Sequence, residues 1–271
     1  WLATAGADGT VRLWQVSDPA KPPTVLNAGS AKYLAFSRDG HRLAAAGRNV
    51  IHLWNMDDLS ADPIVLNGHE DDIWALSFSH DGQWLVTVSM DNTARVWDVV
   101  NPSSPSTILR GHIDVVTDGR FSPDDRWLAT ASSDHTVLLW QVANLATAPI
   151  LLKGHQDGVN AVAFSPDGFW LATASDDNTT LLWEMDNLQS PAKSLQDQSP
   201  GVHELAFSPD GNWLATVTSG SIRLWDMHNL ERNAIVLPRS AEAITEISFS
   251  ADSQWLAAGS QVGTVCLWNI T

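Results

Sequence analysis

Apolar and polar residues alternate along short runs of this chain, and the runs recur in groups of four. One group reads ILLKG (150–154), VNAVAFS (159–165), WLATAS (170–175) and TLLWEM (180–185). Such alternation over short runs is typical of β-strands that bury one side of the chain. Gly, Pro, Asp and Asn separate the runs and favour tight turns. The pattern therefore predicts an all-β chain built of antiparallel hairpins.

Two series of tryptophans give the period of these groups. The first series ends strings such as ARVW and VLLW, has spacings of 40, 43, 43, 43, 42 and 43 residues, and comprises Trp14, Trp54, Trp97, Trp140, Trp183, Trp225 and Trp268. The second begins strings such as WLAT, is interrupted by Arg42, and comprises Trp1, Trp84, Trp127, Trp170, Trp213 and Trp255. Turn sequences such as FSPDG precede the second series. Four short strands cannot bury both faces alone, so consecutive repeats are predicted to stack face to face.

These repeats resemble the WD-repeat β-propeller family, because they also contain Gly68-His69, Gly111-His112, Gly154-His155, Trp97-Asp98 and Trp225-Asp226. The resemblance covers essentially the whole chain. It implies a single domain over residues 1–271, a seven-bladed β-propeller of four-stranded antiparallel blades. The hairpins are expected to end near residues 16, 56, 99, 142, 185, 227 and 270. Repeats of this regularity are similar to those of bacterial signalling and regulatory proteins.

Counting the repeats predicts an incomplete set of strands. Seven copies of the WLAT–LW hairpin are linked by six connecting segments, which gives 26 strands where seven complete blades need 28. The first blade is expected to lack its innermost strand, and the last blade its outermost strand. The two chain ends of a propeller usually share one blade, which removes exposed strand edges. We therefore expect this sequence to be a segment of a longer, multidomain protein.

One set of polar residues has the composition of a catalytic site. A His, a Thr, an Asp and a Trp recur in three repeats, and a hydrolase triad would need such groups around an exposed nucleophile. The family resemblance implies instead that they form buried hydrogen-bonded networks inside the blades, which satisfy polar groups that are removed from water. The three sets are His69, Thr87, Asp91 and Trp97; His112, Thr130, Asp134 and Trp140; and His155, Thr173, Asp177 and Trp183.

Other signatures of catalysis are missing from the sequence. It contains no P-loop string, no G-x-G-x-x-G, no cysteine pair and no histidine pair at a spacing typical of zinc sites. We therefore expect no catalytic residue, no metal site and no cofactor.

Trp74 is the one tryptophan of the 14 that belongs to neither series. When positions are counted back from the Phe of each FS motif, the position of Trp74 is polar in the other repeats. The position before it is apolar in every repeat, so strand alternation predicts that the Trp74 side chain is exposed. By resemblance, this position lies at the rim of the central channel, on the face most often used for partners. The residues predicted to bind a partner there are Trp74, Met90, Glu70, Asp72, Lys32, Thr117, Asn160, His203 and Thr245. The alternative is that Trp74 folds onto its own blade.

Charge narrows the choice of partner. Fifteen basic residues stand against 31 acidic ones, and the formal charge of −16 repels nucleic acid and anionic membranes. An exposed aromatic ring beside carboxylates can bind a Lys or Arg side chain, so the expected partner is a basic protein or peptide. No apolar run approaches the roughly 20 residues that span a bilayer. The single Cys266 allows no internal disulfide and fits a reducing compartment, so we expect the protein in the cytoplasm.

The function predicted from these features is a non-catalytic scaffold or sensor module that presents a loop face to another protein. One alternative is an architectural or autoinhibitory module that restrains a neighbouring domain of the same chain. An enzyme that uses the central channel is less favoured, because the rim positions hold no metal cluster or acid–base pair. The sequence leaves open the identity of the partner and the way the ring is closed.

Overall fold

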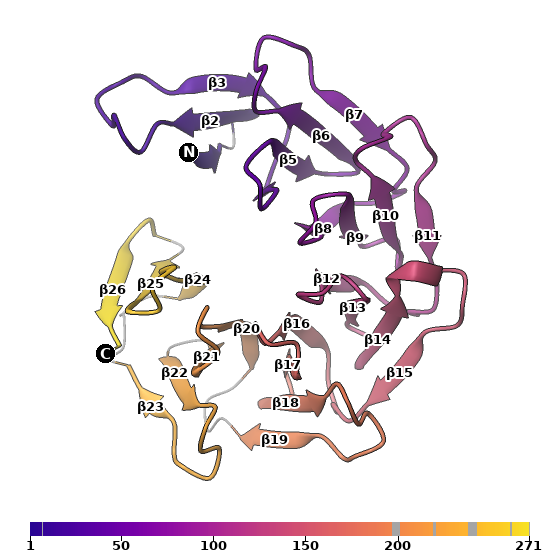
Figure 1. Cartoon of the computed structure of the whole chain (residues 1–271), viewed down its shortest axis with the longest axis vertical. Helices are drawn as coiled ribbons and strands as arrows, with labels where there is room; N and C mark the ends of the chain where they lie inside the picture. Colours follow the sequence, from indigo (N-terminus) through magenta and orange to yellow (C-terminus); the bar gives the residue numbers. More distant parts are fainter. Residues whose placement is uncertain (7, 197–200, 219–220, 238–242, 261, 271) are drawn as a thin grey trace.

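Seven antiparallel sheets make up the computed structural model, which describes all residues except 7, 197–200, 219–220, 238–242, 261 and 271. The sheets stand in an arc around a central channel, and consecutive sheets are neighbours (Figure 1). The predicted fold, a seven-bladed β-propeller, is confirmed. Within the described residues there is no helix long and apolar enough to span a bilayer.

Each sheet is numbered as a blade, and its strands follow the chain from the channel outward. The first blade has three described strands: β1 (Leu2–Ala5), β2 (Thr10–Trp14) and β3 (Thr24–Asn27). The next two have four: β4 (Tyr33–Phe36), β5 (Arg42–Gly47), β6 (Val50–Asn55) and β7 (Ile64–Asn67); then β8 (Ile73–Phe78), β9 (Trp84–Ser89), β10 (Ala94–Asp98) and β11 (Thr107–Leu109).

The remaining blades follow the same order. The fourth contains β12 (Val116–Phe121), β13 (Trp127–Ser132), β14 (Thr136–Gln141) and β15 (Ile150–Lys153), with a short 3-10 turn at Val142–Asn144. The fifth contains β16 (Val159–Phe164), β17 (Trp170–Ser175), β18 (Thr179–Glu184) and β19 (Lys193–Gln196). The sixth contains β20 (Val202–Phe207), β21 (Trp213–Thr218), β22 (Ser221–Asp226) and β23 (Ile235–Val236), and the seventh β24 (Ile244–Phe249), β25 (Trp255–Ser260) and β26 (Val265–Asn269).

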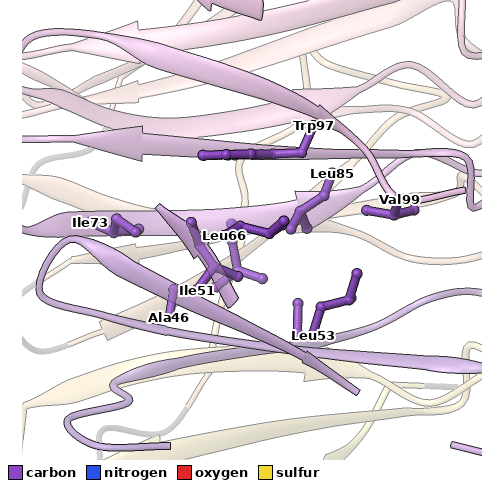
Figure 2. Packing of buried hydrophobic residues seen from close by; sticks show 10 residues of the cluster. Ala46, Ile51, Leu53, Leu66, Ile73, Leu85, Trp97 and Val99 are labelled. Atoms are coloured by element: carbon purple, nitrogen blue, oxygen red, sulfur yellow. The ribbon is translucent and has the colours of Figure 1, made fainter. Parts of the chain in front are cut away.

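The core lies between neighbouring blades because strand alternation gives every sheet two apolar faces. Between the second and third blades, Ile51 and Leu53 pack in one cluster with Leu85 and Trp97, and all four are buried (Figure 2). Similar clusters join the blades that follow. In the last blade the positions of Ile51 and Leu53 are held by Val265 and Leu267, which are 70% and 64% exposed. No blade covers this face within the described residues.

The turns that follow the inner strands are joined from blade to blade. Most have a glycine with positive φ, such as Gly82 at 68°, which lacks the Cβ that disfavours this conformation. The fourth blade has Asp125 at this position, with φ 54°. Its carboxylate accepts hydrogen bonds from the backbone N–H groups of His80 and Asp81, each at 2.8 Å. Asp125 therefore ties its own turn to that of the third blade, and the hydrogen bonds offset its backbone strain.

Candidate functional site

The third blade contains a hydrogen-bonded chain of four side chains that runs from the blade interior to a turn. Trp97 Nε1 donates to Thr87 Oγ1 at 2.8 Å, and the same hydroxyl lies 2.9 Å from His69 Nε2. His69 Nδ1 lies 2.8 Å from Asp91 Oδ2. A carboxylate can only accept, so His69 carries its proton on Nδ1 and accepts the Thr87 hydroxyl proton on Nε2. Every polar atom of the chain thus has a partner of the required kind.

The fourth and fifth blades repeat this geometry. The His Nδ1–Asp distances are 2.9 Å for His112–Asp134 and 3.0 Å for His155–Asp177. Thr130 and Thr173 lie 2.9 Å and 2.7 Å from the respective imidazole Nε2. Trp140 and Trp183 donate to these hydroxyls at 3.0 Å and 3.1 Å. All twelve residues predicted for the three networks are therefore brought together in their expected sets.

Burial makes these networks structural and excludes them from contact with a substrate. Thr87, Thr130 and Thr173 are fully buried, so no hydroxyl is presented as a nucleophile. Burial also lowers the pKa of His69 and His155, which keeps both imidazoles neutral. Burial acts to raise the pKa of Asp91, but hydrogen bonds from Thr93, the Glu70 amide and His69 outweigh it and lower that pKa to about 2. A neutral His beside an ionised Asp is the state that the hydrogen bonds require.

The six residues at the channel rim do not behave as a uniform exposed set. Three of them donate to the backbone of the next blade: Thr117 to Val159 O at 2.6 Å, Asn160 to Val202 O at 3.0 Å and His203 to Ile244 O at 3.0 Å. These bonds join neighbouring inner strands around the channel. The expectation of an exposed side chain is wrong for Thr117, which is buried at 8% exposure because it makes this interblade bond. Thr245 is exposed and donates to Gly259 O within its own blade at 3.3 Å.

Trp74 departs from this interblade bonding. An equivalent hydrogen bond from Trp74 would join the third blade to the fourth. Ser77, on the same strand as Trp74, makes that connection instead, because its Oγ donates to Gly119 O of the fourth blade at 2.8 Å. The indole of Trp74 is 45% exposed and the side chain of Met90 is 40% exposed. Both line a cavity of about 410 Å³ together with Val115, Asn160, Asp176 and His203. Trp74 is therefore not folded into its own blade, and it forms one wall of a cavity that spans the third to sixth blades.

The carboxylate that lines this cavity is not one of those predicted from the sequence. Asp72 forms an ion pair with Lys32 at 3.6 Å, which engages two of the predicted residues with each other. Glu70 is exposed, and its backbone N–H donates to Asp91 at 3.0 Å. Asp176 lines the cavity and holds Asn160 Nδ2 at 2.8 Å. Its position in the repeat is that of Met90, and reading those two positions together could have identified it.

A second group of charges in the channel was also missed. Asp118, Glu204 and Glu246 all stand three residues before the Phe of an FS motif, on three different inner strands. Asp118 is buried; its carboxylate accepts from the Gly119 and Val162 backbone N–H groups and pairs with Arg120 Nε at 3.2 Å. The shared repeat position is a signal that the sequence does contain. The rim position that alternation predicts to be exposed lies one residue earlier, so the prediction did not include this set.

The surroundings of Glu204, one of these channel carboxyls, shift its pKa strongly. Burial raises its pKa, and repulsion from Asp118 raises it further, to about 7, although Arg120 acts in the opposite direction. One carboxylate oxygen accepts the Leu205 backbone N–H at 3.1 Å. Among the described residues there is no group of three or more His, Cys, Asp or Glu side chains with the geometry to hold a metal ion.

Comparison with known proteins agrees with this architecture. The family model described as "WD domain, G-beta repeat" matches residues 1–15, 63–98, 103–141, 147–184, 189–226 and 235–269. The matched ranges leave out most of the second blade, where Arg42 replaces the usual Trp and no Gly-His pair precedes the inner strand.

Several named proteins are similar to part of the chain. "Target of rapamycin complex subunit wat1" of Schizosaccharomyces pombe is 33% identical over 96 residues, which is 35% of this chain and 31% of that protein. "Target of rapamycin complex subunit LST8" of Mus musculus is 35% identical over 96 residues, 35% of this chain and 29% of that protein. "Striatin-4" of Homo sapiens is 33% identical over 117 residues, 35% of this chain and 16% of that protein. The matches span less than a third of the length of each of these relatives.

Proposed function

We propose that this chain, which belongs to the WD domain, G-beta repeat family, is a non-catalytic platform whose Trp74 face binds another protein. The observation that carries the proposal is the departure of Trp74 from the interblade bonding made by Thr117, Asn160 and His203. The position that makes an interblade hydrogen bond in three other blades holds, at Trp74, a large exposed aromatic side chain that lines a cavity. Tryptophan is enriched among the residues that dominate binding energy at protein interfaces.

The names of similar proteins support a protein partner. Two of the relatives are, by name, subunits of the target of rapamycin complex, and a subunit of a complex contacts other proteins. The buried Thr hydroxyls support a non-catalytic role, because the residues that resemble a hydrolase triad are closed to substrate. Cytoplasmic localisation forms part of the proposal and is supported by the single Cys266, which fits a reducing compartment.

The chemistry of the cavity favours a basic side chain of the partner. An Arg guanidinium could stack on the Trp74 ring while it pairs with Asp176, and cation–π contact and ion pairing reinforce each other in such an arrangement. Met90 supplies an adaptable apolar wall for the aliphatic part of the side chain. The overall charge of −16 would attract a basic partner at long range.

Asp176→Asn tests the electrostatic part of this proposal. Capped peptides with a single central Arg are first selected for binding to the unchanged chain, and their affinity is then measured at several salt concentrations. We expect Asp176→Asn to weaken binding roughly threefold to tenfold at low salt and to flatten the salt dependence, because exposed charges are screened beyond about 10 Å at 0.1 M. Asp72→Asn is the matched control, since Lys32 already engages that carboxylate. An unchanged salt dependence in Asp176→Asn would show that the partner does not pair with this carboxylate.

A further inference from the structure

The channel has a second cavity at the end away from Trp74. Each inner strand begins near the Trp74 face and ends at its FS turn, so the turns surround the opposite mouth of the channel. There a cavity of about 530 Å³ lies between the turns, with apolar walls that include Val162, Phe164 and Phe207. Small-ligand sites are concave, mostly apolar and of roughly 300–1,000 Å³, with a few converging polar groups. This cavity has that size and that kind of wall.

The ionisable residues of the cavity are divided between its two sides. Arg38, His80 and Arg120 come from the second, third and fourth blades, whereas Glu204 and Glu246 come from the sixth and seventh. These two groups of blades lie across the channel from each other (Figure 1). The cavity therefore has one basic wall and one acidic wall, and each wall is built by blades far from the other in sequence.

Both walls retain bonding capacity. Arg120 Nε donates to Asp118 Oδ2 at 3.3 Å, and the Arg120 side chain is 45% exposed. Arg38 and Glu246 are exposed and form no ion pair within the described part of the chain. Glu204 is partly buried, and one of its carboxylate oxygens accepts the neighbouring Leu205 N–H. A partly desolvated carboxylate is destabilising unless a cation or a proton neutralises it, and Arg120 supplies only part of that neutralisation, because the pKa of Glu204 stays raised.

We propose that this mouth of the channel binds a small zwitterion, with its ammonium group at Glu204 and Glu246 and its carboxylate at Arg38 and Arg120. The ammonium group would neutralise the acidic wall, and the carboxylate would bind the guanidinium groups, which suit its geometry. The apolar walls would contact the chain between the two charges. Because the two charged walls stand on opposite blades, the ligand class is an extended zwitterion such as an ω-amino acid or a short peptide with free ends. The site is separate from the Trp74 face and does not depend on its function.

The probe is ε-aminocaproate, with caproate and hexylamine as its two half-ligands, measured by titration calorimetry on the unchanged chain. We expect ε-aminocaproate to bind at least tenfold more tightly than either half-ligand. Binding should strengthen between pH 6 and pH 8, because the pKa of Glu204 lies at about 7 and the carboxylate forms in this interval.

Two variants and one control test the assignment of the walls. Glu204→Gln and Arg38→Gln are each expected to weaken binding of ε-aminocaproate at least tenfold. Arg126→Gln, on an exposed turn at the same end of the channel, should leave it unchanged. No measurable binding of ε-aminocaproate, equal binding of hexylamine, or unchanged affinity in Glu204→Gln would each overturn the proposal. Since Arg38 is exposed, its variant tests the basic wall without disturbing the fold.

Discussion

Glu204→Gln is expected to stabilise the protein at pH 8 and to have almost no effect at pH 4. Burial and the nearby Asp118 raise the pKa of Glu204 from 4.5 to about 7 in the folded chain. Below pH 4.5 the carboxyl is protonated in both states, and a neutral acid and an amide are similar. Above pH 7 the folded chain carries an unfavourable charge that the unfolded chain solvates. At 1.36 kcal/mol per pKa unit, the free energy of unfolding should rise by about 3 kcal/mol in the variant.

The measurement is urea denaturation of the two proteins at pH 4, 6 and 8. The raised pKa means that the unchanged chain loses stability as pH rises from 4.5 through 7, and Glu204→Gln should abolish this loss. Glu246→Gln is the matched control, because Glu246 is an exposed carboxyl in the same channel. If Glu204→Gln and the unchanged chain show parallel pH profiles, Glu204 is not a buried charge.

His112→Ala is expected to lower the free energy of unfolding by about 1 to 3 kcal/mol, because it leaves the carboxylate of Asp134 and the hydroxyl of Thr130 without a partner. The side chains of His112 and Asp134 are 3% and 5% exposed, so water cannot replace the lost bonds without opening the blade. Hydrogen bonds lower the pKa of Asp134 against the effect of burial, so its carboxylate stays ionised and the cost persists at neutral pH.

His228→Ala provides the comparison for this variant. His228 Nε2 also donates a side-chain hydrogen bond, to Asn212 Oδ1 at 2.7 Å, but His228 is exposed, and water can take the place of the imidazole. Thermal or urea denaturation should separate the two variants by more than 1 kcal/mol. Equal midpoints would mean that the blade networks add nothing to stability.

The repeat could be read from the sequence because each blade folds by the same local rules. The alternation in WLATAS and TLLWEM predicts β17 (Trp170–Ser175) and β18 (Thr179–Glu184), and both were found. The network residues could be placed because His155, Thr173 and Asp177 keep fixed offsets within one repeat. The spacing of residues along the sequence is sufficient to predict contacts between residues of a single blade.

Contacts between blades were the part that sequence reasoning missed. Thr117 meets Val159, and Asp125 meets His80, across more than forty residues, so no local pattern reveals either bond. Thr117 was placed in solvent because alternation says which side a residue faces and not what covers that side. Asp176 shares the repeat position of Met90, but its proximity to Trp74 arises between blades two positions apart on the ring, which the spacing within one repeat does not show.

The central claim is that Trp74 anchors a protein partner, and the affinity of the selected Arg peptides for Trp74→Ala tests it most directly. Phe169→Ala is the control, because the Phe169 side chain is also aromatic and 39% exposed. Phe169 follows an FS turn and does not line the cavity of Trp74. The account predicts that Trp74→Ala weakens binding at least tenfold at every salt concentration, as loss of an interface anchor worth about 2 kcal/mol would do, while Phe169→Ala binds normally. Peptides that bind Trp74→Ala as tightly as the unchanged chain would contradict it.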